Sequence, residues 1–117
     1  YEVGRRLGVE TIFAERFEER LILRRGFKIP ENSKVLVVED VITTGKSALE
    51  CSEIVKKNKS EVVGYACIID RSNNSVLIKQ KIISQIKFEI ETFREKELPD
   101  ELKKIMPVKP GSRNLSK

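Results

Sequence analysis

Two uninterrupted apolar runs dominate the hydrophobic pattern of the chain, at residues 35–38 and 62–69. A strand that is apolar at every position is typical of a parallel sheet, because both of its faces are covered. Between the runs, apolar side chains recur at helical spacing over residues 46–58. We therefore predict strands at residues 35–39 and 62–69 on either side of one helix, which together make a βαβ unit of an α/β domain with a mainly parallel sheet.

The segment before the first apolar run predicts a short helix and a β-hairpin. Residues 1–7 have helical spacing, and the helix is expected to stop at Gly8. Residues 9–14 are rich in β-branched and aromatic side chains, which favour a strand. Residues 15–20 are nearly all charged and indicate a loop, and residues 21–24 indicate a second short strand. The two strands would pair as a hairpin with a charged, mobile tip that could act as a lid.

The segment after the second apolar run gives weaker signals. Residues 76–83 match neither the helix nor the strand pattern clearly. Residues 86–93 alternate strictly between apolar and polar, which predicts a half-buried strand. We expect a short helix over residues 98–105 and an irregular tail from Pro107, where proline, glycine and basic residues accumulate.

The composition narrows the class of protein. With 117 residues, 39% of them apolar and 35% charged, the chain is expected to form one globular domain. It contains no histidine, which excludes Ser/His catalysis and histidine metal sites. Cys51 and Cys67 form no CxxC pair, so we expect buried free thiols and a reducing, cytoplasmic location. No apolar stretch is long enough to suggest a membrane partner.

The charge pattern suits a small anionic ligand. The net charge is +5, but acidic and basic residues alternate along the chain rather than forming one basic block. Only 6% of the residues are aromatic, so the chain lacks the stacking platform of a nucleic-acid module. We therefore expect no nucleic-acid partner.

Charged side chains follow both apolar strands where each strand ends. Glu39 and Asp40 follow the first strand, and Asp70 and Arg71 follow the second. In open α/β sheets, ligands bind outside the carboxyl ends of the strands. Adjacent carboxylates accept hydrogen bonds from neighbouring sugar hydroxyls or help to hold Mg²⁺. A polar ligand is therefore expected at this edge of the sheet.

A small polar turn follows the acidic pair. Thr43, Thr44, Gly45 and Ser47 supply hydroxyls and backbone N–H groups at the start of the predicted helix, an arrangement that favours a phosphate. A sugar phosphate would satisfy the acids and the turn together. The alternative is a capped helix that binds nothing, but two carboxylates after an apolar run are costly to place without a ligand.

The turn also contains the last part of a P-loop, Gly45-Lys46-Ser47. The full motif requires a glycine five residues before Gly45, and this chain has Asp40 there. A carboxylate at that position would repel the phosphates that the loop should hold. A P-loop NTPase is therefore disfavoured.

Residues 35–47, VLVVEDVITTGKS, resemble the phosphoribosyl-diphosphate (PRPP) signature of type I phosphoribosyltransferases. Further stretches are similar to the orotate phosphoribosyltransferases: YEVGRRLGVETIFAER at residues 1–16, LRRGF at residues 23–27, IIDRS at residues 68–72, IKFEIETF at residues 86–93 and VKPGSR at residues 108–113. The resemblance covers nearly the whole chain. It implies transfer of the phosphoribosyl group from PRPP to orotate, with Mg²⁺ bound through PRPP, in a homodimer.

The resemblance also implies roles for particular residues. Asp40, with Arg16 and Arg20 from the hairpin tip, would act in catalysis, whereas Thr43 and Arg71 would bind orotate. No side chain would bind the metal directly. PRPP would contact the strand end and the turn, namely Glu39, Asp40, Val41, Ile42, Thr43, Thr44, Gly45, Lys46 and Ser47.

Three residues depart from the pattern of the resembling family. Glu19 and Lys46 stand where glycine is common, and Arg20 stands where lysine is common; arginine does not readily give up a proton. The resemblance also implies a diphosphate-binding loop and a further segment ahead of Tyr1, so we expect the chain to be a C-terminal portion with weak activity or none. Two alternatives stay open: transfer to another base, and a non-catalytic PRPP-binding regulatory domain.

Overall fold

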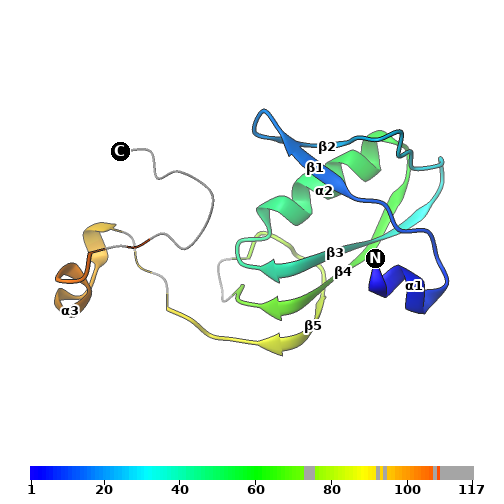
Figure 1. Ribbon diagram of the computed structural model, residues 1–117. Coiled ribbons are helices and arrows are strands. Elements are labelled where there is room, and N and C mark those ends of the chain that lie inside the picture. Colours follow the sequence, from blue (N-terminus) through cyan, green and yellow to red (C-terminus); the bar gives the residue numbers. More distant parts are fainter. Residues whose placement is uncertain (73–75, 92, 94, 107, 109–117) are drawn as a thin grey trace.

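The computed structural model describes residues 1–72, 76–91, 93, 95–106 and 108 of the chain. Figure 1 shows a parallel sheet with a helix along one face and a separate hairpin beside that helix. In chain order the elements are α1 (Glu2–Leu7), β1 (Ala14–Phe17), β2 (Arg20–Leu23), β3 (Lys34–Ile42), α2 (Lys46–Lys57), β4 (Glu61–Asp70), β5 (Ile82–Lys87), η2 (Glu95–Glu97) and α3 (Asp100–Lys103).

The predicted βαβ unit is confirmed. β3 pairs with β4 in parallel, and β4 pairs with β5 in parallel, so β4 is the central strand of this sheet. The helix α2 connects β3 to β4 and packs against both. Because parallel strands end at the same edge, the carboxyl ends of β3 and β4 lie next to each other.

The hydrophobic core lies between the sheet and α2. Val37 and Tyr65 are register partners on β3 and β4, both are buried, and Ala48 of α2 packs with them. Cys67 is buried in the same cluster, whereas Cys51 is half-buried, and both thiols are free. Burial of these apolar side chains is the main term that holds the helix to the sheet.

The hairpin was predicted, but its strand boundaries were wrong. The strand expected at residues 9–14 and the loop expected at residues 15–20 are replaced by β1 and β2, which pair from Ala14 with Leu23 to Phe17 with Arg20. Charged side chains are tolerated in this two-stranded ribbon because they lie at or near the surface and pair with one another: the partly shielded Glu15 contacts Arg25 at 2.8 Å. The turn contains only Glu18 and Glu19.

The strand predicted at residues 86–93 was also wrong. β5 begins four residues earlier, at Ile82, and ends at Lys87, because its partner β4 ends at Asp70, the register partner of Lys87. Phe88 donates to the carbonyl of Asp70 at 2.8 Å, and residues 88–91 then have no regular structure. The ambiguous segment 76–83 therefore contains the start of this strand.

The C-terminal predictions have mixed outcomes. α3 confirms the short helix expected after Pro99. The irregular tail expected from Pro107, including most of the VKPGSR stretch, lies outside the described residues. Within the described part of the chain, no helix has both the length and the apolar character that crossing a membrane requires.

Candidate functional site

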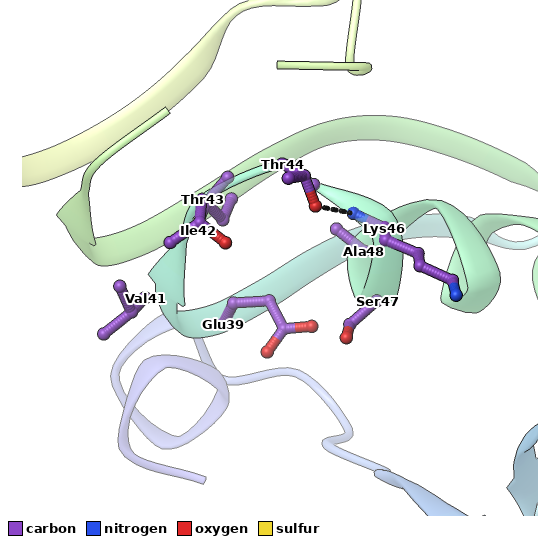
Figure 2. A pocket seen from close by; sticks show the side chains of 9 residues that line it. Glu39, Val41, Ile42, Thr43, Thr44, Lys46, Ser47 and Ala48 are labelled. Atoms are coloured by element: carbon purple, nitrogen blue, oxygen red, sulfur yellow. Dashed lines mark hydrogen bonds between the residues drawn. The ribbon is translucent and has the colours of Figure 1, made fainter. Parts of the chain in front are cut away.

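The turn between β3 and α2 forms a small cavity, with a volume of about 70 Å³. Figure 2 shows the carboxylate of Glu39 and the hydroxyl of Ser47 on one side of this cavity and Thr43 and Thr44 on the other. The structure thus brings together all but one of the residues predicted to contact PRPP. The lining consists of Glu39, Val41, Ile42, Thr43, Thr44, Gly45, Lys46, Ser47 and Ala48.

The first turn of α2 opens towards this cavity. Gly45 occupies the N-cap position, so no side chain at the cap accepts a hydrogen bond from the helix. The hydroxyl of Thr44 makes only a long contact of 3.4 Å with the backbone N–H of Lys46. Helix α2 has 12 residues, and its N-terminal N–H groups together with the helix dipole favour an anion at this end.

Gly45 is required here by its conformation and by its surroundings. Its φ is +78°, in the left-handed region that favours glycine. A Cβ at this position would lie 2.8 Å from two carbon atoms of Ile78, which is closer than carbon atoms pack. The backbone N–H of Leu77 also donates to the carbonyl of Thr44 at 2.9 Å. The segment before β5 therefore supports the turn.

Sequence reasoning missed this supporting segment. Residues 76–78 are apolar and follow no helix or strand period, and Ile78 is nevertheless buried in the core. A short apolar cluster beyond the loop after β4 was the available signal. It indicated burial but not the partner, because the contact with Gly45 joins positions far apart in the sequence.

The two acids at the end of β3 point in different directions. Glu39 is half-buried and lines the cavity, whereas Asp40 is exposed and does not line it. The carboxylate of Asp40 accepts a hydrogen bond from the backbone N–H of Val41 at 2.7 Å. Successive side chains of a strand alternate between its faces, so adjacent acids on a strand cannot both point the same way.

The environment of Glu39 favours its neutral form. Burial raises the pKa of this carboxyl, the negative charge of Asp40 raises it further, and the positive charge of Arg16 partly opposes both effects. Arg16 therefore lies within electrostatic range of the cavity. Burial also raises the pKa of the neighbouring Cys51 thiol to about 11, so this cysteine is not a reactive thiolate at neutral pH.

The end of β4 lies directly beside the end of β3. The backbone N–H of Arg71 donates to the carbonyl of Ile42 at 2.8 Å. The carboxylate of the buried Asp70 accepts from the backbone N–H of Ser72 at 2.8 Å. In the described part of the chain, Asp70 and Arg71 form no ion pair, so a surface salt bridge does not explain the arginine.

Arg71 carries an unused hydrogen-bond donor. Its Nε atom is buried and has no hydrogen-bond partner among the described residues. Leaving a buried polar donor without an acceptor costs on the order of 1–3 kcal/mol, and more when the group is charged. An anionic group on a ligand at the strand ends could supply the acceptor.

The two arginines predicted at the hairpin tip lie in different surroundings. Arg16 lines a larger cavity of about 340 Å³, which also contains Glu39 and Ser47. Its guanidinium contacts the carboxylate of Glu50 on α2 at 3.0 Å. Arg20 is exposed and lines neither of these cavities. The structure therefore brings Arg16 close to the predicted site and leaves Arg20 outside it.

Among the described residues, no three Cys, Asp or Glu side chains form a cluster that could hold a metal ion. The acidic groups nearest the turn are divided between the cavity and the opposite face of β3.

The chain is similar in sequence to known proteins. The chain is 51% identical over 113 residues to an orotate phosphoribosyltransferase of Caldicellulosiruptor bescii and 47% identical over 118 residues to one of Methylorubrum extorquens. These alignments cover 97% and 100% of the chain but 60% of each relative. The chain therefore spans about three fifths of the length of these curated relatives.

A solved structure shares the fold. The adenine phosphoribosyltransferase of Thermoanaerobacter pseudethanolicus superposes with a TM-score of 0.57 over 74% of this chain and 61% of its own, at 20% sequence identity. At that identity the likeness concerns the fold alone. A family model described as the phosphoribosyl transferase domain matches residues 4–98, which include the hairpin, the turn and the ends of β3 and β4. The chain therefore belongs to the phosphoribosyl transferase domain family.

Proposed function

We propose that this chain is the part of an orotate phosphoribosyltransferase that holds the ribose phosphate of PRPP and contributes to the orotate site. The observation that carries the proposal is the cavity at the start of α2, where a carboxylate and a helix N-terminus face the same small space. We infer the identity of the acceptor, orotate, from the curated relatives, which are named orotate phosphoribosyltransferases.

The turn is the proposed site of the 5′-phosphate. Thr43, Thr44 and Ser47 offer hydroxyl donors, and the first N–H groups of α2 offer backbone donors. Lys46 adds a positive charge at the same turn, where it can neutralise part of the phosphate charge. Val41 and Ile42 complete the wall of the cavity and position the turn.

The acids at the end of β3 are the proposed partners of the ribose hydroxyls. Glu39 already lines the cavity and can accept from a hydroxyl there. Asp40 lies on the other face of the strand in this structure, so a contact with the ribose requires its side chain to rotate away from the N–H of Val41. A carboxylate beside the ribose would also stabilise positive charge that develops at the ring during transfer.

Arg71 and Thr43 are the proposed partners of orotate. Orotate carries a carboxylate, and the Nε of Arg71, which is buried and has no partner among the described residues, is a donor suited to it. A hydrogen bond between the end of β4 and the end of β3 holds Arg71 beside the turn that contains Thr43. The acceptor and the sugar phosphate would therefore meet at adjacent strand ends.

The reaction joins a ring nitrogen of orotate, which has already lost its proton to solvent, to the first carbon of ribose while the bond from that carbon to diphosphate breaks. The departing diphosphate takes the bonding electrons, so positive side chains near it lower the barrier. Arg16 is the hairpin arginine that lies within range of the cavity, and Arg20 would have to move with the hairpin to reach it.

We propose that Mg²⁺ arrives bound to PRPP and not on a preformed protein site. The described residues offer no acidic cluster for a metal, whereas the diphosphate itself supplies oxygen ligands. Such an ion would neutralise negative charge on the leaving group. The proposal extends to a cytoplasmic homodimer without a nucleic-acid or membrane partner, by resemblance to the family.

Calorimetric titration of the 117-residue chain tests the phosphate part. PRPP is expected to bind the unmodified chain, and Ser47→Ala is expected to weaken binding by about tenfold or more, the effect of losing one hydrogen bond to a charged group. Ser33→Ala, in the turn before β3, is a matched control and should bind PRPP normally. Equal affinities for all three proteins would contradict the proposed phosphate site.

A second titration tests the acceptor. With PRPP present, orotate is expected to bind and adenine is not, and Arg71→Gln should abolish most of the orotate binding while it leaves PRPP binding intact. Arg25→Gln, in the connection after β2, is the matched control. Preferential binding of adenine would favour a different phosphoribosyltransferase, and PRPP binding without any acceptor would favour the regulatory alternative.

A further inference from the structure

Glu50 lies outside every role discussed above, yet it contacts the hairpin. It is on the first turns of α2, and its carboxylate lies 3.0 Å from the Nη2 atom of Arg16. The side chains are 35% exposed for Arg16 and 26% exposed for Glu50, so both are partly shielded from water. This ion pair joins residues 34 positions apart, and it links the hairpin directly to α2. This helix begins directly after residues 43–45, the turn proposed to bind the phosphate and called the phosphate turn below.

The same arginine also holds the hairpin turn. Its Nη1 atom donates to the backbone carbonyl of Glu19 at 2.6 Å. Glu18 and Glu19 both have positive φ values, of 44° and 66°, a conformation that two-residue hairpin turns usually give to asparagine or glycine. A single guanidinium therefore supports a strained turn and connects it to α2.

Arg16 lies where it could exchange Glu50 for a negatively charged ligand. It shares the larger cavity with Glu39 and Ser47, and these two residues also line the smaller cavity at the turn. The two cavities therefore adjoin along Glu39 and Ser47. A phosphate ligand carries more negative charge than one carboxylate, and a partly exposed ion pair is weak, so an anion in this space can compete for the guanidinium.

We propose that Glu50 is a positioning residue that holds Arg16, and with it the hairpin, against α2 and releases Arg16 to the phosphates of the bound ligand. This inference rests on the proposed function for the identity of the ligand. In the free protein, Glu50 keeps the hairpin ordered. In the bound protein, Arg16 leaves Glu50 for the ligand.

Other acidic residues do not fit this role. Glu15 pairs with Arg25, and Glu53 on α2 pairs with Lys56 of the same helix, so neither carboxylate joins the hairpin to α2. Glu53 lies three residues after Glu50 on the same helix and carries the same charge. It is therefore a matched control for the loss of one negative charge near the turn.

The proposal is tested first without any ligand. Amide hydrogen exchange in the free 117-residue chain should become faster throughout the hairpin in Glu50→Gln, because the ion pair is lost, and should be unchanged there in Glu53→Gln. Equal exchange in the two variants would overturn the proposal. This readout does not depend on PRPP, so it stands even if the proposed function fails.

The second test is a double-mutant cycle with PRPP. Glu50→Gln should tighten PRPP binding by up to about fivefold relative to Glu53→Gln, because the Glu50 carboxylate no longer competes with the ligand for Arg16. In an Arg16→Gln background, Glu50→Gln should have no effect beyond that of Glu53→Gln. An equal gain in PRPP affinity in both backgrounds, or weaker PRPP binding by Glu50→Gln, would overturn the proposal that Arg16 exchanges Glu50 for the ligand. If the unmodified chain binds no PRPP, the proposed function fails, and hydrogen exchange alone decides the role of Glu50.

Discussion

The hydroxyl groups of Ser52 and Tyr65 lie 2.7 Å apart in the interior of the protein and connect α2 to β4. Both residues are buried, with 2% and 3% of their surface exposed. Ser52 also donates to the carbonyl of Ala48 at 2.9 Å, which uses its only hydrogen. Tyr65 must therefore be the donor in the pair, with Ser52 as the acceptor.

The direction of this hydrogen bond predicts that removal of the two hydroxyl groups has unequal effects on stability. Ser52→Ala leaves the buried Tyr65 hydroxyl without its acceptor, which should cost about 1–3 kcal/mol of unfolding free energy. Tyr65→Phe leaves Ser52 bonded to Ala48 and should cost about 0.5–1.5 kcal/mol. Urea unfolding measures both. The double variant should be less destabilised than the sum of the two single variants, and a larger loss in Tyr65→Phe would contradict the assigned donor.

Substitutions at three glycines separate the two constraints on Gly45, which are its positive φ and its closeness to Ile78. Gly45→Ala introduces a side chain at positive φ and against Ile78. Gly26→Ala has the positive φ but open space around the new Cβ, and Gly64→Ala has neither problem, with 3.7 Å to Leu36. We expect little change for position 64, a loss of about 1–2 kcal/mol for position 26 and a larger loss for position 45.

Only the change at position 45 should also weaken PRPP binding, since position 26 lies in the connection before β3 and position 64 lies within β4. Thermal unfolding and PRPP titration of the three variants check the prediction. Equal losses of stability at positions 26 and 45 would show that the contact with Ile78 contributes nothing.

The raised pKa of Glu39 predicts how the site responds to pH. Its neutral form should appear at a higher pH than that of an ordinary glutamate, and Asp40→Asn should lower the pKa because it removes a nearby negative charge. Carboxyl carbon NMR titration measures both. Glu61→Gln, at the opposite end of the sheet, should leave the pKa of Glu39 unchanged.

The sign of the stability change follows from this shift. The folded protein binds the proton of Glu39 more tightly than the unfolded chain does, so this residue adds stability as the pH falls and loses it as the pH rises through the raised pKa. PRPP affinity should change in the opposite sense, since the charged carboxylate is the better acceptor for ribose hydroxyls. Affinity that rises with acidification over this range would argue against a ribose contact by Glu39.

The hairpin turn should tolerate glycine better than its native residue. Glu19 has a φ of 66°, which costs a residue with a side chain about 1–2 kcal/mol. Glu19→Gly should therefore raise the unfolding free energy by about 1 kcal/mol, while the carbonyl that Arg16 contacts is retained. Glu10→Gly, an exposed position without positive φ, should be neutral or destabilising in the same thermal unfolding experiment.

Local patterns in the sequence were sufficient for the centre of the fold. The apolar runs that became β3 and β4, and the helical spacing between them, predicted a parallel βαβ unit with the acids and the phosphate turn at one edge. Even the divergence of Glu39 and Asp40 could have been read from the sequence, because adjacent strand residues point to opposite faces. These features depend on neighbours in the chain, and so does the signal that predicts them.

The hairpin and β5 show the limit of prediction from neighbouring residues. Glu15 and Arg16 look like loop residues, yet they form a strand because β2 is present to pair with them. The alternating pattern of residues 86–93 is a good strand signal, yet most of it is not a strand because β4 has already ended. In both cases a partner elsewhere in the chain decides which backbone groups can be bonded.

The sequence by itself therefore determined the βαβ unit, the place of the candidate site and the residue types around it, because periodicity and turn chemistry act between near neighbours. Only the tertiary structure decided that Ile78 packs against Gly45, that the buried Nε of Arg71 has no partner among the described residues, and that Glu50 pairs with Arg16. Each of these relationships depends on packing and on which groups are shielded from water, and residues distant in sequence set both.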